Sequence, residues 1–168
     1  MDSHAGINPD KWGPHFWKTL FYAAMNYPVK IDPKNKCHVS LSKNYKNFYA
    51  SLQYVLPCVY CLESYRRFWI ELPIDNHLGS RVDLLKWVYG LKDKVNKKLI
   101  FQEKQCLAAE KKLLLEKMVK KFGPRSKWNK TTTAVYNTSV EKLSRKILKT
   151  SQSPSWNTVL SQLSDMRN

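Results

Sequence analysis

Two cysteines stand three residues apart in the stretch Pro57-Cys58-Val59-Tyr60-Cys61. Proline is favoured in the first turn of a helix, so a helix is expected to begin here. Residues i and i+3 of a helix share one face, and the two sulfurs can therefore reach each other or a common partner. Backbone N–H groups at a helix start favour the thiolate, the reactive form of cysteine. The spacing predicts a redox pair or half of a metal site.

The other cysteines are Cys37, which precedes His38, and Cys106. Zinc needs four ligands, usually in two close-spaced pairs, and the adjacent side chains of Cys37 and His38 diverge. A thioredoxin-like dithiol needs a strand before the CxxC helix, whereas a helical pattern precedes it here. A redox dithiol therefore ranks above zinc. It requires an electron acceptor, because a dithiol that makes disulfides must be reoxidised.

The chain is strongly basic, with a net charge of +16 in 168 residues. Such a charge attracts polyanions. The lysines are spread over helical patterns without a nucleic-acid motif, which favours a solvated surface and at most unspecific nucleic-acid binding. No apolar run reaches the roughly 18 residues of a membrane span, and the first ten residues lack a signal-peptide pattern. We expect a cytoplasmic protein with no membrane contact.

Helical periodicity dominates the first two thirds of the chain. Apolar residues recur three and four apart, and no alternating strand pattern competes with them. After Pro124 the composition shifts to Lys, Ser and Thr. We predict an all-α domain over residues 1–122 and a basic extension over residues 123–168. The expected helices cover residues 14–26, 40–55, 58–72, 80–99 and 103–121, with short ones at 140–148 and 156–163, and Cys37 and His38 end a loop that begins at residue 29.

Three motifs resemble the Erv/ALR family of FAD-linked sulfhydryl oxidases. The stretch Trp12-Gly13-Pro14-His15-Phe16-Trp17, continued by Ala24, Tyr27 and Pro28, is similar to that family's opening "WG…W..LH..A..YP" helix. The CxxC with its proline matches "PCxxC", and Trp87, Val95, Asn96 and Leu99 are similar to the closing "W…HN.VN..L". The motifs stand in the family's order over residues 12–106. The small size resembles a viral member from the large cytoplasmic DNA viruses.

The resemblance implies a four-helix bundle with a fifth short helix, a homodimer, and FAD beside the CxxC. Phe21 stands where most members have histidine, and Lys92 with Asp93 replaces a His-Asn pair. These changes keep an aromatic wall and add a cation that suits a diphosphate. Cys106 matches a family cysteine whose disulfide partner position is Ile70 here. The FAD-binding residues implied are Trp12, Gly13, Trp17, Phe21, Trp87, Lys92, Asn96 and Lys98.

The resemblance also implies the activity. Cys58 and Cys61 would form the catalytic disulfide of a thiol oxidase that takes electrons from thiol-containing proteins and passes them through FAD to dioxygen, giving hydrogen peroxide. Which of the two cysteines faces the flavin stays open. The alternatives are a zinc-bound helical adaptor, a basic nucleic-acid-binding module, and a degenerate oxidase kept as a scaffold.

Overall fold

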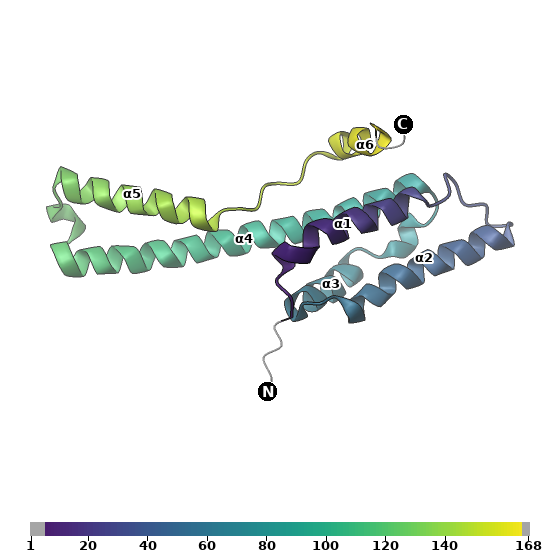
Figure 1. The fold of residues 1–168 in the computed structure, drawn as a ribbon, viewed down its shortest axis with the longest axis horizontal. Helices are drawn as coiled ribbons and strands as arrows, with labels where there is room; N and C mark the ends of the chain where they lie inside the picture. The colour runs from purple at the N-terminus through teal and green to yellow at the C-terminus, as the bar shows by residue number, and fades with distance from the viewer. Residues whose placement is uncertain (1–5, 166–168) are drawn as a thin grey trace. The chain divides into compact units, whose positions relative to one another are not determined.

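The computed structural model describes residues 6–165, and in this range helices form nearly all of the regular structure (Figure 1). The only extended pairing among these residues is an isolated bridge between Lys30 and Ser80. The all-α prediction is therefore confirmed. The α-helices are α1 (Pro9–Met25), α2 (Lys36–Val55), α3 (Val59–Glu71), α4 (Arg81–Phe122), α5 (Lys130–Ile147) and α6 (Trp156–Asp165), and the 3₁₀ helices are η1 (Ile74–His77) and η2 (Arg125–Lys127).

The chain forms two compact units, which are described separately. The bundle unit comprises the residues up to Val95 together with those from Pro154 onward, and the hairpin unit comprises Asn96–Ser153. The predicted domain boundary after residue 122 falls inside the hairpin unit, at the end of α4. That boundary stays a prediction.

Two helices begin earlier than expected. The α1 helix starts at Pro9 because the Asn8 side chain accepts the Asp10 N–H at 3.0 Å, and Pro14 lies inside the helix. The α2 helix starts at Lys36 because the Asn35 side chain accepts the backbone N–H of Cys37 at 2.9 Å. The predicted starts at residues 14 and 40 are wrong, since an asparagine N-cap lay upstream of each. Cys37 accordingly lies in the first turn of a helix and not in a loop.

The α4 helix begins as predicted but does not break. Ser80 Oγ accepts the Asp83 N–H at 3.1 Å and donates to the Asp83 carboxylate at 2.6 Å, so Ser80 caps the helix start. The predicted division into helices 80–99 and 103–121 is wrong, because no proline or glycine interrupts the chain between Gly90 and Gly123. At Gly123 the backbone takes φ 81°, and the helix ends there as predicted.

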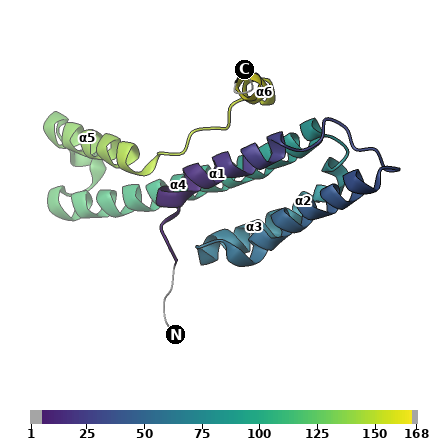
Figure 2. The same ribbon diagram turned by 45° about the vertical axis from the view of Figure 1, so that its right-hand side comes forward.

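The core of the bundle unit lies between α1, α2, α3 and the first half of α4, which run side by side (Figures 1 and 2). Trp87 is fully buried there, and its ring contacts Tyr49 and Trp69 at centroid distances of 5.0 and 5.8 Å. Close-packed aromatic rings of this kind bury large apolar areas. The short α6 joins the same core through Leu163, and its Trp156 contacts Tyr89 at 5.6 Å.

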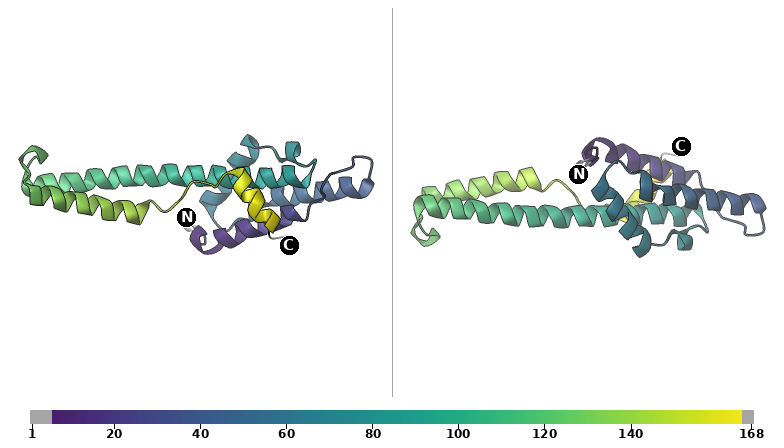
Figure 3. Two further views of the ribbon diagram at one scale, coloured as in Figure 1. Left: turned by 90° about the horizontal axis from the view of Figure 1, so that it is seen from above. Right: turned by 90° about the horizontal axis from the view of Figure 1, so that it is seen from below.

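The hairpin unit consists of the second half of α4 and the antiparallel α5 (Figure 3). The turn between them is closed by the Trp128 indole, which donates to the Gly123 carbonyl at 2.8 Å and packs on Tyr136 at 5.5 Å. After α5, the Glu103 carboxylate accepts hydrogen bonds from Thr150.

Among the described residues, no helix is both long and apolar enough to cross a bilayer.

Candidate functional site

The two cysteines of the CxxC occupy different positions at the start of α3. Cys58 is the N-cap residue, and its Sγ accepts the Cys61 N–H at 3.3 Å. The Cys58 carbonyl accepts the N–H of Leu62 at 2.9 Å, the first helical hydrogen bond. Cys58 is 4% exposed, whereas Cys61 is partly exposed one turn further on. The predicted helix start at this pair is confirmed, but Pro57 precedes the N-cap and does not lie in the first turn as predicted.

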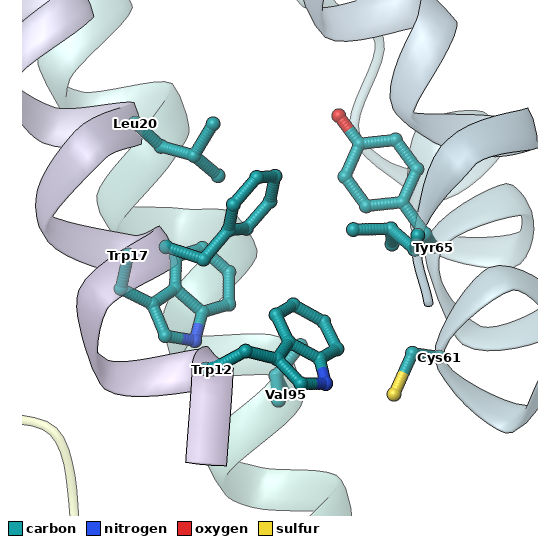
Figure 4. Close-up of a pocket in the computed structure, with 9 residues that line it drawn as sticks. Trp12, Trp17, Leu20, Cys61, Tyr65 and Val95 are labelled. Atoms are coloured by element: carbon teal, nitrogen blue, oxygen red, sulfur yellow. The ribbon is translucent and has the colours of Figure 1, made fainter. Parts of the chain in front are cut away.

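An open pocket of about 520 Å³ lies beside α3 in the bundle unit. Figure 4 shows Trp17 and Leu20 of α1 on one wall and Cys61 and Tyr65 of α3 on the opposite wall, with Trp12 between them. The pocket is lined by Trp12, Gly13, Phe16, Trp17, Leu20, Leu56, Cys61, Tyr65 and Val95.

Buried hydroxyl groups hold the two walls at their spacing. Tyr65 donates to the Tyr49 carbonyl at 2.9 Å, which joins α3 to α2. Tyr49 in turn donates to the Leu20 carbonyl at 2.9 Å, which joins α2 to α1. Burial raises the pKa of Tyr49 and Tyr65 far above the usual range, so both phenols stay protonated and keep donating.

Three of the eight residues implied for cofactor binding line this pocket with Cys61: Trp12, Gly13 and Trp17. Phe21 and Trp87 lie in the bundle core, where the Trp87 indole donates to the Leu72 carbonyl at 2.9 Å. Cys58 does not line the pocket either.

The last three of these residues lie on α4. Lys92 is half-buried within the bundle unit. Asn96 and Lys98 belong to the hairpin unit, where the Asn96 amide donates to Ser153 Oγ at 3.0 Å. The structure thus gives Asn96 a partner within its own unit.

Five pocket residues were not predicted as site residues. Phe16 and Leu20 follow Trp12 and Gly13 at helical spacing, so the phase of α1 could have identified them. The other three are Leu56, Tyr65 and Val95. Val95 stands in the closing motif without a predicted role in the site, and nothing in the sequence marks Leu56 or Tyr65. Leu56 follows α2, Tyr65 lies on α3 and Val95 on α4, so their approach depends on helix packing.

The remaining cysteines lie outside the pocket. Cys37 is exposed on α2, and Cys106 is exposed on α4. His38 Nδ1 accepts the Asp32 N–H at 3.1 Å. Within residues 6–165, no three His, Cys, Asp or Glu side chains gather as a metal site would require.

A comparison with protein families matches residues 14–117 to the Erv1 / Alr family. The match covers more than half of the chain. The chain belongs to the Erv1/Alr family. A comparison with curated proteins finds no match. Erv1/Alr proteins are thiol oxidases and generally bind FAD, so membership supports an oxidoreductase that acts on thiols with oxygen as electron acceptor.

The pocket of this Erv1/Alr chain is lined by aromatic rings that could pack on the faces of a flat ring. Trp12 and Phe16 pack edge to face at 5.5 Å, and with Trp17 they offer apolar aromatic surfaces to a flat ring. Cys61 brings a sulfur atom to the same space. An apolar pocket with one reactive group in its wall fits a planar redox cofactor.

Proposed function

We propose that this chain is an FAD-dependent thiol oxidase that forms disulfide bonds in protein substrates through Cys58 and Cys61. The observation that carries the proposal is the position of Cys61 in the wall of an aromatic pocket, with Cys58 one turn away at the helix start. Membership of a thiol oxidase family supports the same conclusion.

Different residues would hold the ring system and the phosphates of the cofactor. Trp12, Phe16 and Trp17 would pack on the ring system, and the Lys92 ammonium, on the helix that carries Val95, is suited to a phosphate. When bound, FAD accepts two electrons from a dithiol and passes them to dioxygen, giving hydrogen peroxide. Leu20, Leu56 and Val95 would keep water away from the sulfur that faces the pocket.

The geometry favours different roles for the two cysteines. Because Cys61 lines the pocket and Cys58 does not, Cys58 is the sulfur that a substrate thiolate would attack in the oxidised pair. That attack forms a substrate–Cys58 disulfide, breaks the Cys58–Cys61 bond and releases Cys61 as a thiolate. A second substrate thiolate then attacks the substrate sulfur of the mixed disulfide and releases Cys58. Two electrons and two protons leave the substrate in total.

The test begins with the colour of the purified full chain. A yellow protein with bound flavin is expected, and oxygen consumption with dithiothreitol should be lost in Cys58→Ser and in Cys61→Ser. Cys37→Ser and Cys106→Ser are matched controls, since both side chains are exposed outside the pocket, and they should keep the wild-type rate. A colourless protein that FAD cannot reconstitute would reject the proposal.

The exposed face of α2 favours a homodimer. Leu41, Phe48 and Val55 recur at intervals of seven residues, and all three are exposed. Apolar residues at this interval form a single stripe, as in paired helices. A second copy of the chain, offering the same stripe, would cover it. A viral origin and a cytoplasmic place of action stay predictions from the sequence.

A further inference from the structure

Residues Gly6 and Ile7 lie directly against the first cysteine of the pair. The Ile7 N–H donates to the Pro57 carbonyl at 2.7 Å. Gly6 has φ 75°, and a Cβ atom there would overlap the Pro57 carbonyl oxygen and lie 2.9 Å from the Cys58 Cα. Only glycine permits this conformation and this approach without strain.

The same short segment is held from its other side by a pocket residue. The Trp12 indole donates to the Ile7 carbonyl at 3.1 Å. The Ile7 side chain is 60% exposed and contributes little to the attachment. The segment is thus held mainly through its backbone.

Cys58 is buried, whereas several apolar residues close to it in the sequence are exposed. Cys58 is 4% exposed, whereas its neighbours Val59 and Tyr60 are 47% and 67% exposed, and Tyr54, before Pro57, is 74% exposed. Exposed apolar groups gathered in one region mark interaction sites. Cys58 is therefore buried, with the Gly6 backbone close to its Cα atom and exposed apolar residues on both sides of it in the sequence.

We propose that Gly6–Ile7 is a strap beside Cys58, and that client thiols reach Cys58 by displacing it. The inference rests on the proposed oxidase function. A client segment donates its own N–H to the Pro57 carbonyl in place of Ile7 and sets apolar side chains against Tyr54 and Tyr60. The partner is a polypeptide segment that carries a dithiol with apolar neighbours, and displacement itself changes no covalent bond.

The strap is tested by the reactivity of Cys58 in the reduced, anaerobic full-length protein. Alkylation by iodoacetamide is followed for each cysteine by mass spectrometry, and the rate at a covered thiol follows the population of the open form. Ile7→Pro removes the donating N–H and is expected to raise the Cys58 rate about fivefold, the factor given by one lost hydrogen bond. Gly6→Ala introduces the overlapping Cβ and should raise it at least as much.

Matched variants distinguish the loss of the strap contact from a general destabilisation of the protein. Ile7→Ala keeps the N–H, and Gly79→Ala adds a Cβ whose nearest neighbour, an Asp83 oxygen, is 3.6 Å away, so both should label at the wild-type rate. Cys37 is exposed and serves as the internal standard in every variant. An unchanged Cys58 rate in both Ile7→Pro and Gly6→Ala would overturn the inference.

Measurements of turnover test whether clients bind at the place that the strap occupies. With a dithiol peptide that has apolar flanking residues, kcat/KM from oxygen consumption should rise in Ile7→Pro by a factor similar to that of labelling. Faster labelling with an unchanged kcat/KM for the peptide would show that clients bind elsewhere and would overturn the inference. If neither wild type nor variants consume oxygen while Cys58 labelling still rises, the oxidase proposal fails and the covering strap stands.

Discussion

Replacing Tyr65 by phenylalanine is expected to destabilise the protein at pH 7 and to stabilise it slightly at pH 11. At neutral pH the change removes one buried hydrogen bond, from Tyr65 to the Tyr49 carbonyl at 2.9 Å. Such a bond contributes about 1 kcal/mol. Tyr49→Phe removes the matching bond to the Leu20 carbonyl and should cost about as much.

The reversal at high pH follows from the raised pKa of both phenols. In the unfolded chain these tyrosines ionise near the ordinary value of 10.0, whereas burial keeps them protonated in the folded protein. Above pH 10 the folded state therefore holds more protons than the unfolded state, and stability falls as pH rises. For one such tyrosine the loss at pH 11 is about 1.4 kcal/mol, which exceeds the value of its hydrogen bond. Tyr65→Phe does not have this loss. At pH 11 its free energy of unfolding should therefore be about 0.4 kcal/mol higher than that of the wild type.

The assay is urea unfolding under reducing conditions at pH 7 and at half-unit steps to pH 11, followed by circular dichroism. The double variant Tyr49→Phe/Tyr65→Phe should lose both contributions, so its stability should change least with pH. Tyr54→Phe is the control, since its side chain is 74% exposed, and it should follow the wild type throughout. If Tyr65→Phe is less stable than wild type by the same margin at pH 7 and pH 11, the reasoning from buried phenols is wrong.

Two further results are expected. Phe48→Glu places a charge in the exposed stripe of α2 and should turn a dimer into a monomer in analytical ultracentrifugation. Ile70→Glu, at a more exposed apolar position on α3, should leave the dimer intact, and a Phe48→Glu dimer would exclude this face. In the hairpin unit, burial raises the pKa of Glu103, but hydrogen bonds from Thr150 and Lys149 outweigh it and leave the pKa lowered. Protection of the Thr150 amide from hydrogen exchange should therefore be present at pH values above the ordinary carboxyl pKa range and be lost as pH falls. Glu103→Gln should remove that pH dependence. Identical pH profiles for wild type and Glu103→Gln would contradict the prediction.

Local signals in the sequence were sufficient for most of the helices. Ser80 and Asp83 predicted the start of α4 because the capping box needs only residues three apart, and Gly123 predicted its end. The early starts of α1 and α2 were missed although Asn8 and Asn35 are good caps, since the apolar periodicity begins later than the hydrogen bonding. The division of α4 into two predicted helices is wrong because no proline or glycine separates them, and helices break mainly at such residues.

The sequence by itself determined the helical class, the cysteine pair at a helix start and the family, because each depends on residue types at short or regular spacing. Only the tertiary structure decided that Cys61 and not Cys58 faces the pocket, that Phe21 and Trp87 belong to the core, and that Gly6 lies against Pro57. Periodicity identifies the apolar face of each helix, but the rotation of one helix against another is set by how their side chains pack. The roles of the two cysteines therefore depend on contacts with α1 and with the segment that precedes it.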